Sequence, residues 1–276
     1  MQILGNIIPF FIGHLDNFSR REVISLAYIS IENILGFNKS DCILRNEFKL
    51  NKNQIDIFKQ IVLDLKKEIP IQYILGETEF YNLRIKVNNS TLIPRKETEE
   101  LVRWILEHKF NSLLDIGSGS GCISISIAKN SSASISALDI SKNSLDIAQN
   151  NANYHNVNIN FICDNIFKYI PKKKYDVIVS NPPYVLESEK LFMSKNVLAF
   201  EPHSALFVKD TDPLKFYKRI AYLSSKFLNK SGVLFFEINE KFGDEIVNLL
   251  SEYDFVDIEL KKDINGRDRM IKSVLK

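Results

Sequence analysis

"LLDIGSGSGCISISIA", residues 113–128, is the stretch that decides which fold the sequence predicts. An apolar run ends at Ile116, and three glycines follow at alternate positions, Gly117, Gly119 and Gly121. Apolar residues at helical spacing come after the glycines. Glycines between a strand and a helix let the backbone turn tightly and approach a bound ligand closely. The stretch therefore predicts the strand, turn and helix of a nucleotide-binding domain.

The spacing of these glycines excludes two common phosphate-binding motifs. The dinucleotide fingerprint G-x-G-x-x-G needs glycine where this chain has Cys122, and no G-K-[ST] of a P-loop follows. The next expected strand ends at Asp139, twenty-two residues after Gly117, where a carboxylate can accept both hydroxyls of a ribose. Alternate glycines followed by such an acid are typical of an S-adenosylmethionine site in a class I methyltransferase.

The third expected strand ends in Asp164 and Asn165, which we interpret as partners for the edge of an adenine ring. A purely structural interpretation is also open for each of these residues. Asp164 can instead be a helix cap, the three glycines can form a tight turn without a ligand, and Asp139 can be a helix cap. These residues alone do not decide between a cofactor site and structural roles.

Strand and helix patterns alternate along most of the chain. Strands are expected at residues 112–116, 134–140, 159–163, 175–180, 232–238, 255–260 and 270–275. Helices are expected at residues 96–108, from 121, and at 142–155, 213–228 and 241–252. This alternation predicts an α/β fold, Rossmann-like, with a mostly parallel sheet and helices on both faces.

The first part of the chain follows a different pattern. Apolar residues at helical spacing predict helices at 19–35 and 53–69, with Ser19 and Asn53 as N-caps. Residues 71–94 alternate between apolar and polar and predict a hairpin that turns at "NNS", residues 88–90. We therefore expect a helical N-terminal domain at 1–69, a hairpin linker at 70–94 and the methyltransferase domain at 95–276.

"SNPPYV", residues 180–185, lies at the end of the fourth expected strand, where open α/β sheets bind their ligands. An amide or amine nitrogen beside a carbonyl or ring is a poor nucleophile, because its lone pair is delocalised. The side-chain oxygen of Asn181 and the backbone carbonyl of Pro182 can hold such an NH₂ and orient it towards a methyl group. The prolines stiffen the loop, and Tyr184 can stack on the planar group and exclude water. "NPPY" is shared by enzymes that methylate adenine N6 and by enzymes that methylate protein glutamine.

Five stretches of the chain resemble the peptide chain release factor glutamine methyltransferase family. They are "PIQYILGETEFYNLRIKVNNSTLIPRKETEELV" (70–102), "DIGSGSG", "SNPPYV", "FEPHSAL" (200–206) and "DINGRDRMI" (263–271). The resemblance runs in order from about residue 68 to 273. The block at 70–102 is the most specific part, because generic methyltransferases lack it.

The resemblance implies that the substrate is the glutamine of the Gly-Gly-Gln loop in class I peptide chain release factors, methylated on its side-chain nitrogen. It implies that the N-terminal helices help to dock the release factor. The cofactor, S-adenosylmethionine, would meet Gly117, Ser118, Gly119, Ser120, Gly121, Asp139, Asn165 and Asn181. Substrate would be held by Asn181, Pro182, Pro183 and Tyr184, with Asn181, Pro182 and Tyr184 as the catalytic residues.

Three alternative functions remain beside this one. A related enzyme that methylates a glutamine of a ribosomal protein shares the loop. An adenine N6 methyltransferase acting on nucleic acid predicts a basic groove or a target-recognition domain, which the formal charge of +2 does not indicate. A cofactor-binding scaffold without catalysis is disfavoured by the retained loop from Asn181 to Tyr184.

The sequence departs from the family pattern at three places. Lys96 stands where the family usually has proline. "KDTDPL" (209–214) replaces a glycine-containing "GxDGL", and "FFEINEKFG" (235–243) lacks the usual histidine- or isoleucine-glycine after its glutamate. Glu97 and Glu99, with Arg95, are explained equally well as residues that shape a substrate channel or as a helix start with acids that favour its dipole.

Composition is consistent with a soluble protein of the cytoplasm. The apolar fraction is 45% and the charged fraction 25%, both ordinary for a globular chain of 276 residues. The N-terminal apolar stretch is broken by Pro9 and Gly13 and is too short to cross a bilayer. The cysteines and histidines are scattered, so we expect neither disulfides nor a metal site. No direct contact with nucleic acid or membrane is expected.

Overall fold

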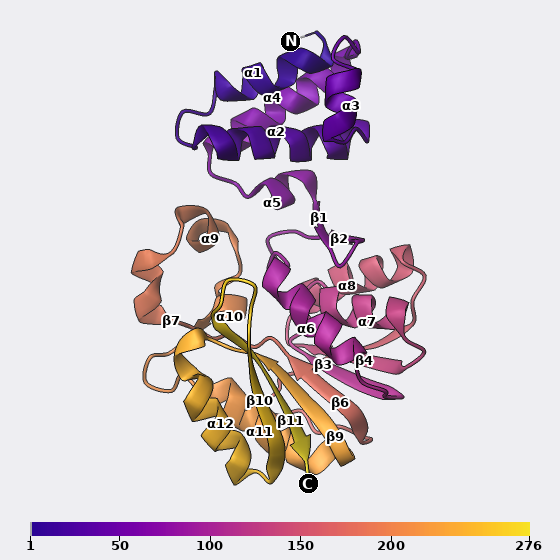
Figure 1. Cartoon of the computed structure of the whole chain (residues 1–276), viewed down its shortest axis with the longest axis vertical. Helices are drawn as coiled ribbons and strands as arrows, with labels where there is room; N and C mark the ends of the chain where they lie inside the picture. Colours follow the sequence, from indigo (N-terminus) through magenta and orange to yellow (C-terminus); the bar gives the residue numbers. More distant parts are fainter. Residues whose placement is uncertain (1) are drawn as a thin grey trace. The chain divides into compact units, whose positions relative to one another are not determined.

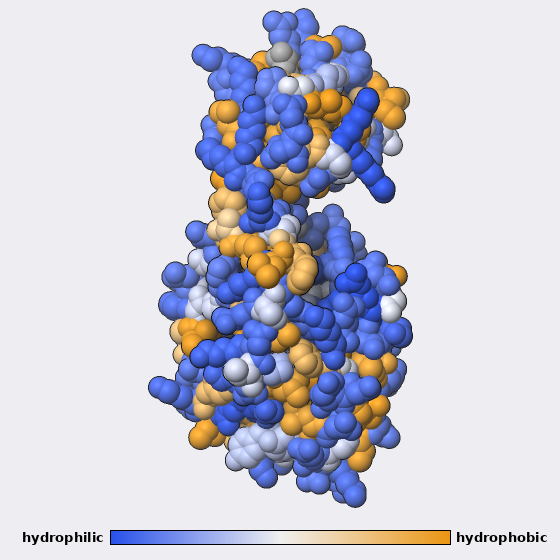
Figure 2. All heavy atoms as spheres, turned by 90° about the vertical axis from the view of Figure 1, so that its left-hand side faces the viewer, coloured by the Kyte–Doolittle hydropathy of each residue, from blue (hydrophilic) through white to orange (hydrophobic). Residues whose placement is uncertain are grey.

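The computed structural model describes residues 2–276, and the chain divides into two compact units (Figure 1). The first unit comprises Met1–Gly76 and Ser194–Phe200, and the second comprises Glu77–Met193 and Glu201–Lys276. The partition at residues 69/70 and 94/95 that the sequence suggests stays a prediction. Hydrophilic residues cover much of the face that Figure 2 displays, with hydrophobic patches between them. Within residues 2–276, no helix has the length and apolar character needed to cross a membrane.

The first unit is helical, as the sequence predicts. Its elements are η1 (Leu4–Asn6), α1 (Ile7–Ile12), α2 (Arg20–Leu35), α3 (Lys39–Leu44), α4 (Lys52–Lys66), α5 (Ile71–Leu75) and α9 (Lys195–Phe200). The apolar faces of α1, α2 and α4 enclose a core of buried residues that includes Phe11, Ile31 and Phe58.

One of the two predicted N-caps in this unit is confirmed and the other is wrong. Ser19 caps α2, because its side chain accepts a hydrogen bond from the backbone N–H of Glu22. Helix α4 begins two residues earlier than expected, and its N-cap is Asn51, not Asn53. Asn51 accepts from the N–H of Gln54, whose side chain accepts in return from the N–H of Asn51. This reciprocal capping box favours the earlier start.

The predicted hairpin exists, but its turn is not at residues 88–90. Strands β1 (Glu77–Phe80) and β2 (Leu83–Lys86) pair antiparallel, so the turn consists of Tyr81 and Asn82. Both have positive φ, 49° and 58°, which is the backbone of a type I′ hairpin turn. "NNS" forms a separate turn after β2, in which the N–H of Thr91 donates to the carbonyl of Asn88.

The second unit is built on a seven-stranded sheet with the order β10-β11-β9-β6-β3-β4-β5. The strands are β3 (Ser112–Ile116), β4 (Ser134–Asp139), β5 (Ile159–Cys163), β6 (Tyr175–Ser180), β9 (Leu228–Glu237), β10 (Phe255–Lys262) and β11 (Asp268–Leu275). The five strands from β9 to β5 run parallel, while β11 and β10 are antiparallel to their neighbours. This confirms the predicted α/β class with a mostly parallel sheet.

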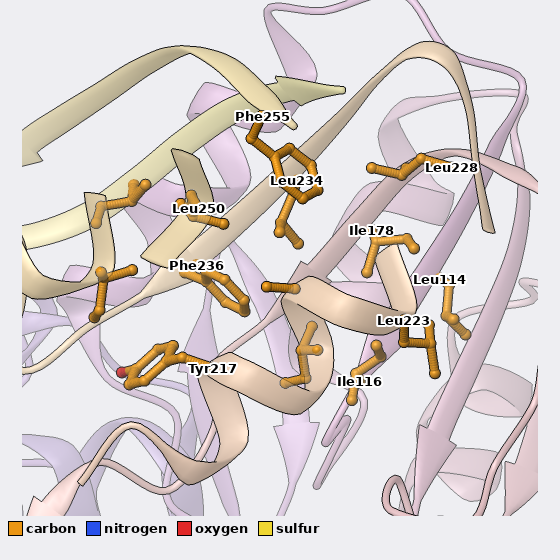
Figure 3. Close-up of a cluster of buried hydrophobic side chains, with 14 of the residues drawn as sticks. Leu114, Ile116, Ile178, Tyr217, Leu223, Leu228, Leu234, Phe236, Leu250 and Phe255 are labelled. Atoms are coloured by element: carbon orange, nitrogen blue, oxygen red, sulfur yellow. The ribbon is translucent and has the colours of Figure 1, made fainter. Parts of the chain in front are cut away.

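Helices cover both faces of this sheet (Figure 1). They are α6 (Lys96–Leu106), α7 (Cys122–Asn130), α8 (Lys142–Tyr154), α11 (Lys215–Phe227) and α12 (Gly243–Glu252). Successive residues of β9 point to opposite faces, since Phe235 packs against Trp104 of α6 and Phe236 against Tyr217 of α11. Figure 3 shows the core on the α11 and α12 face, where Phe236 and Tyr217 lie with apolar side chains of β3, β6 and β9.

Short elements fill the connections after β6. They are β7 (Val185–Leu186), η2 (Glu187–Phe192), α10 (His203–Leu206), β8 (Phe207–Val208) and η3 (Glu240–Phe242). Strands β7 and β8 pair in parallel outside the main sheet. Of these elements, only η3 overlaps an expected one, the helix at 241–252; the others are too short to show a periodic pattern.

Gly121, at the start of α7, provides a test of the glycine turn. Its φ of +79° disfavours any side chain, and an added Cβ would lie 3.0 Å from Cδ1 of Ile125 and 3.1 Å from Cβ of Ala148. We expect Gly121→Ala to lower the free energy of unfolding by about 2–4 kcal/mol, measured by urea denaturation without cofactor. Gly266→Ala is the control, because Gly266 has a φ of +78° but open space around it, so only the backbone cost of about 1–2 kcal/mol applies. Equal losses in the two variants would contradict the role of close packing at Gly121.

Candidate active site

The glycine turn is tied to the end of the neighbouring strand β4. The backbone N–H groups of Gly117 and Ser118 both donate to the carbonyl of Leu138, at 2.8 and 3.1 Å. The N–H of Gly119 donates to Oδ2 of Asp139 at 2.8 Å. All three glycines of the turn have positive φ, between 55° and 79°. The turn therefore has one defined shape, set by backbone bonds to β4 and by the carboxylate that ends it.

Asp139 is positioned by two backbone bonds and retains capacity to accept more. Its Oδ1 accepts from the N–H of Ser141 at 2.8 Å, and its Oδ2 accepts from Gly119. Each carboxylate oxygen has a second lone pair. Burial raises the pKa of Asp139, and the backbone hydrogen bonds oppose that rise. The carboxylate can accept two hydroxyl groups from the pocket that it lines.

A pocket of about 390 Å³ opens at the carboxyl ends of β3, β4, β5 and β6. This volume lies in the range of small-molecule sites in proteins. The predicted site residues that line it are Gly117, Gly119, Asp139, Asn165, Asn181, Pro182 and Pro183. Further lining residues come from segments that sequence reasoning did not assign to the site, among them Ser90, Thr91, Leu92, Phe167, Pro202, Ser204, Lys215 and Phe216.

Asn181 follows the last residue of β6 and lines the pocket beside the glycine turn. The strand end is held in place because the Ser180 hydroxyl donates to the carbonyl of Ile116 at 2.7 Å. The carbonyl of Asn181 lies 3.9 Å from the position that a Cβ on Gly117 would take. The backbone of Asn181 is therefore close to the glycine turn, and Asn181 lines the same pocket as Gly117 and Gly119.

Tyr184 is not among the residues that line the pocket. Its hydroxyl donates to Oε1 of Glu237 at 3.0 Å, and its ring packs against the sheet core. Burial raises the pKa of Tyr184, and the neighbouring Glu237 raises it further. The structure thus brings Asn181 and both prolines to the pocket, whereas Tyr184 lies behind them. Stacking of Tyr184 on a substrate stays a prediction.

Glu237 is a buried acid that sequence reasoning did not assign to the site. It ends β9, only 1% of it is exposed, and its Oε2 accepts from the hydroxyl of Thr98 at 2.6 Å. Burial raises the pKa of its carboxyl group, and the bonds from Thr98 and Tyr184 oppose that rise. One signal was available, since an apolar strand that ends in an acid is the pattern that identified Asp139.

Asp164 and Asn165 follow β5 and both line the pocket. Oδ1 of Asp164 accepts from the N–H of Asn165 at 2.6 Å, and Oδ1 of Asn165 accepts from the N–H of Phe167 at 2.9 Å. Both side chains therefore shape the backbone after β5. The bond from Phe167 uses only the amide oxygen of Asn165, and Asn165 lines the pocket.

Three predicted cofactor residues lie behind the pocket surface. Ser118 and Ser120 are buried, and their hydroxyl oxygens have no hydrogen-bond partner within residues 2–276. Gly121 is the N-cap of α7. None of the three lines the pocket. Their direct contact with a cofactor stays a prediction.

Arg95 precedes α6 and pairs with Glu201, whose side chain is buried. The guanidinium donates to Oε1 of Glu201 at 2.6 Å, and Oε2 accepts from the N–H of Ile93 at 3.1 Å. Glu97 and Glu99 lie in the first turn of α6, where acids favour the helix dipole. Lys96 begins this helix and pairs with Glu99 at 2.9 Å. The ion pair between Arg95 and Glu201 therefore joins the segment before α6 to the segment that contains Pro202, which lines the pocket.

The raised pKa of the buried Asp115 carboxyl group leads us to expect that the stability of the protein depends on pH. Asp115 lies fully buried before the glycine turn, and burial raises the pKa of its carboxyl group from 3.8 to about 7. The folded chain therefore holds a proton there that the unfolded chain loses above about pH 4, so this group's contribution to stability falls as pH rises towards 7. We expect Asp115→Asn, which mimics the neutral form, to raise the free energy of unfolding at pH 8 by about 2–4 kcal/mol relative to wild type. The gain should vanish near pH 4, as measured by urea denaturation at both pH values. A gain that is equal at both would contradict the assignment.

The pocket suits a nucleoside cofactor. It combines a carboxylate with free acceptor capacity at Asp139, an amide donor at Asn165 and a glycine turn with open space at Gly119. Among the described residues, no cluster of three or more His, Cys, Asp or Glu side chains is arranged to hold a metal ion.

Comparisons with known proteins match both units. The family described as PrmC N-terminal domain matches residues 20–76, and the family described as Methyltransferase small domain matches residues 96–201. The release factor glutamine methyltransferase of Flavobacterium psychrophilum is 48% identical over 264 residues, covering 92% of this chain and 93% of that protein. The protein of the same name from Bacteroides thetaiotaomicron is 40% identical, covering 93% and 94%. A solved methyltransferase from Pyrococcus furiosus shares the fold, with a TM-score of 0.55, 14% identity, and coverage of 81% and 98%.

Proposed function

The chain belongs to the release factor glutamine methyltransferases and uses S-adenosylmethionine, and on this basis we propose that its substrate is a class I peptide chain release factor. The methyl group would be transferred to the side-chain nitrogen of the glutamine in the factor's Gly-Gly-Gln loop. The observation that carries this proposal is the position of Asn181 and Pro182 at the pocket beside the glycine turn. Two oxygen acceptors at one place suit a primary amide.

The cofactor is proposed to bind along the ends of β3, β4 and β5. Asp139 accepts the ribose hydroxyls, Asn165 donates to the adenine edge, and Gly117 and Gly119 allow close approach of the backbone. When bound, S-adenosylmethionine supplies an electrophilic methyl group on a sulfonium. The donors and acceptors named here fit that molecule, since each lines the pocket.

The catalytic contribution of the chain is proposed to be orientation. Oδ1 of Asn181 accepts one N–H of the glutamine amide and the carbonyl of Pro182 accepts the other, which fixes the plane of a weakly nucleophilic nitrogen. Such orientation can lower a barrier by about 7–11 kcal/mol. No strong base is needed before transfer, because the proton becomes acidic only on the methylated nitrogen. Pro182 and Pro183 present no N–H that would compete for the acceptors.

The N-terminal helices are proposed to dock the release factor. Residues 20–76 match the family described as PrmC N-terminal domain. The first unit has a hydrophobic core of its own and can therefore present a stable surface. No direct contact with nucleic acid is proposed. A variant that lacks the N-terminal helices at residues 20–76 should retain its affinity for the cofactor. It should require a higher concentration of release factor to reach half of its maximal rate.

The experiment that tests the function compares four acceptors. Labelled S-adenosylmethionine is mixed with a purified class I release factor from the same source, its Gln-to-Ala loop variant, a mixture of ribosomal proteins, or adenine-containing DNA. We expect label on the unmodified release factor alone. Label on ribosomal protein would favour the related glutamine methyltransferase, and label on DNA an adenine N6 enzyme; either result would refute the proposed substrate.

A further inference from the structure

Alternate residues of the stretch 237–241, which begins at the last residue of β9, contact the loop at residues 181–189, here called the catalytic loop. The Tyr184 hydroxyl donates to Oε1 of Glu237 at 3.0 Å. Nδ2 of Asn239 donates to the backbone carbonyl of Tyr184 at 3.1 Å and to Oε2 of Glu189 at 3.2 Å. Lys241 completes the series, since its Nζ lies 2.5 Å from Oε1 of Glu189. Residues 237–241 thus bind the loop at both its side chains and its backbone.

Two members of this segment are buried and are themselves firmly held. Glu237 is 1% exposed and Asn239 is 6% exposed. Thr98 donates to the carboxylate of Glu237 at 2.6 Å, and the hydroxyl of Tyr217 donates to its backbone carbonyl at 3.1 Å. A buried polar side chain that lost these partners would carry a large desolvation penalty. The segment is therefore a rigid support for the loop.

The loop needs such support because its centre cannot anchor itself. Pro182 and Pro183 have no backbone N–H to donate. Its upstream end is fixed by the bond from Ser180 to the carbonyl of Ile116. Its downstream end is fixed at Tyr184 and Glu189 by residues 237–241. The position of Asn181 consequently depends on anchors at both ends.

A second segment, residues 209–214, also contacts the loop. "FFEINEKFG" contains Asn239 and Lys241, and "KDTDPL" contains Asp210. The carboxylate of Asp210 accepts from the N–H of Ser188 at 3.3 Å and from the hydroxyl of Ser188. Residues 237–241 and Asp210 thus contact the same stretch, residues 184–189.

We propose that Glu237, Asn239 and Asp210 are positioning residues that hold the catalytic loop, residues 181–189, in the geometry that methyl transfer requires. Asn239 is the central member, because one amide group bridges the Tyr184 carbonyl and the Glu189 carboxylate. This proposal rests on the proposed function, because residues 181 and 182 of the loop are the ones proposed to hold the glutamine amide.

The test replaces Asn239 with aspartate and with alanine. Aspartate puts a third oxygen acceptor against the Tyr184 carbonyl and the Glu189 carboxylate, so it should displace the loop more than alanine does. We expect Asn239→Asp to lower kcat about 10- to 100-fold, and Asn239→Ala less, with cofactor Kd unchanged within about twofold. Adding Glu189→Gln to Asn239→Asp removes one of the repelling carboxylates and should restore part of the rate.

Asn229→Asp is the matched control. Nδ2 of Asn229 donates to Oδ1 of Asp176 at 2.6 Å, so aspartate there also faces an acid, but at the amino end of β6. We expect this variant to lose stability and keep kcat. Equal kcat in Asn239→Asp and Asn229→Asp would reduce Asn239 to a stabilising residue and overturn the proposal.

A second measurement follows the loop without any acceptor substrate. Amide hydrogen exchange of the peptide covering residues 184–192 should accelerate in both Asn239 variants and stay as in wild type in Asn229→Asp. Unchanged exchange would overturn the proposal whichever acceptor the enzyme uses. If wild type labels no release factor while exchange responds as expected, the proposed function fails and the positioning role stands.

Discussion

Asn181→Ala is expected to lower kcat for release factor methylation about 10³-fold. The variant loses one of the two acceptors for the glutamine amide, so the nitrogen is held at a single point and its lone pair is no longer directed. Loss of one positioned polar group in an active site commonly reduces kcat by about 10²–10³. The contribution of orientation makes the upper end of this range the expected value here.

The measurement is single-turnover transfer of labelled methyl with saturating cofactor. Asn181→Asp keeps an oxygen of similar reach and should retain more activity than alanine. Cofactor Kd should rise by a smaller factor than kcat falls in both variants, because Asp139 and the glycine turn still line the pocket when the Asn181 side chain is changed. An alanine variant that keeps more than about a tenth of the wild-type rate would be incompatible with the proposed role.

Local patterns explain why most of the sheet could be predicted from the sequence. The expected strands at 112–116, 159–163 and 175–180 coincide with β3, β5 and β6. Strands β3 and β6 are short, mainly apolar runs that are almost wholly buried, as expected inside a parallel sheet. Strand β5 lies at the edge of the sheet and is only partly buried, but its run is bounded by turn residues. Because Asp139 and Asn181 follow the carboxyl ends of parallel strands, their meeting at one pocket could also be expected from the sequence.

The errors arise where two candidates with similar local chemistry compete. Asn51 and Asn53 are both good N-cap residues, and the choice depended on Gln54, which completes a capping box only with Asn51. Residues 71–94 contain two turns, and the sequence predicts only the one at "NNS". The hairpin turn is at Tyr81 and Asn82, because Phe80 pairs with Leu83; tyrosine seldom adopts positive φ, so no local signal marked this turn.

The contacts behind the pocket could not be predicted, because they join distant parts of the chain. Thr98 and Glu237 are separated by 139 residues, and Tyr184 and Glu237 by 53. No local pattern encodes such a pair. The bond between the hydroxyl of Tyr184 and the buried carboxylate of Glu237 is therefore visible only in the folded chain, and the contact of Tyr184 with substrate stays a prediction. The support of the catalytic loop is a property of tertiary packing.

Asp139→Ala is expected to raise the cofactor Kd about 100-fold, equivalent to about 2.7 kcal/mol. The variant loses the acceptor proposed for the ribose, and it also releases the N–H of Gly119, which the carboxylate holds at 2.8 Å. Asp139→Asn should bind weakly as well, because its NH₂ group must face the N–H of either Gly119 or Ser141, both of which are donors. Isothermal titration with S-adenosylhomocysteine measures both values.

The pH dependence of cofactor binding tests whether the carboxylate of Asp139 binds the cofactor or only holds the backbone of the glycine turn. Burial raises the pKa of Asp139, so its carboxyl group takes up a proton at a higher pH than an exposed aspartate does. A protonated carboxyl keeps its shape but loses acceptor capacity on one oxygen. Wild-type affinity should therefore fall as the pH is lowered through this raised pKa, whereas Asp139→Asn should show no such fall. If the cofactor Kd of both proteins follows the same pH curve, the carboxylate of Asp139 does not bind the ribose, and its two backbone bonds alone explain its place beside the glycine turn.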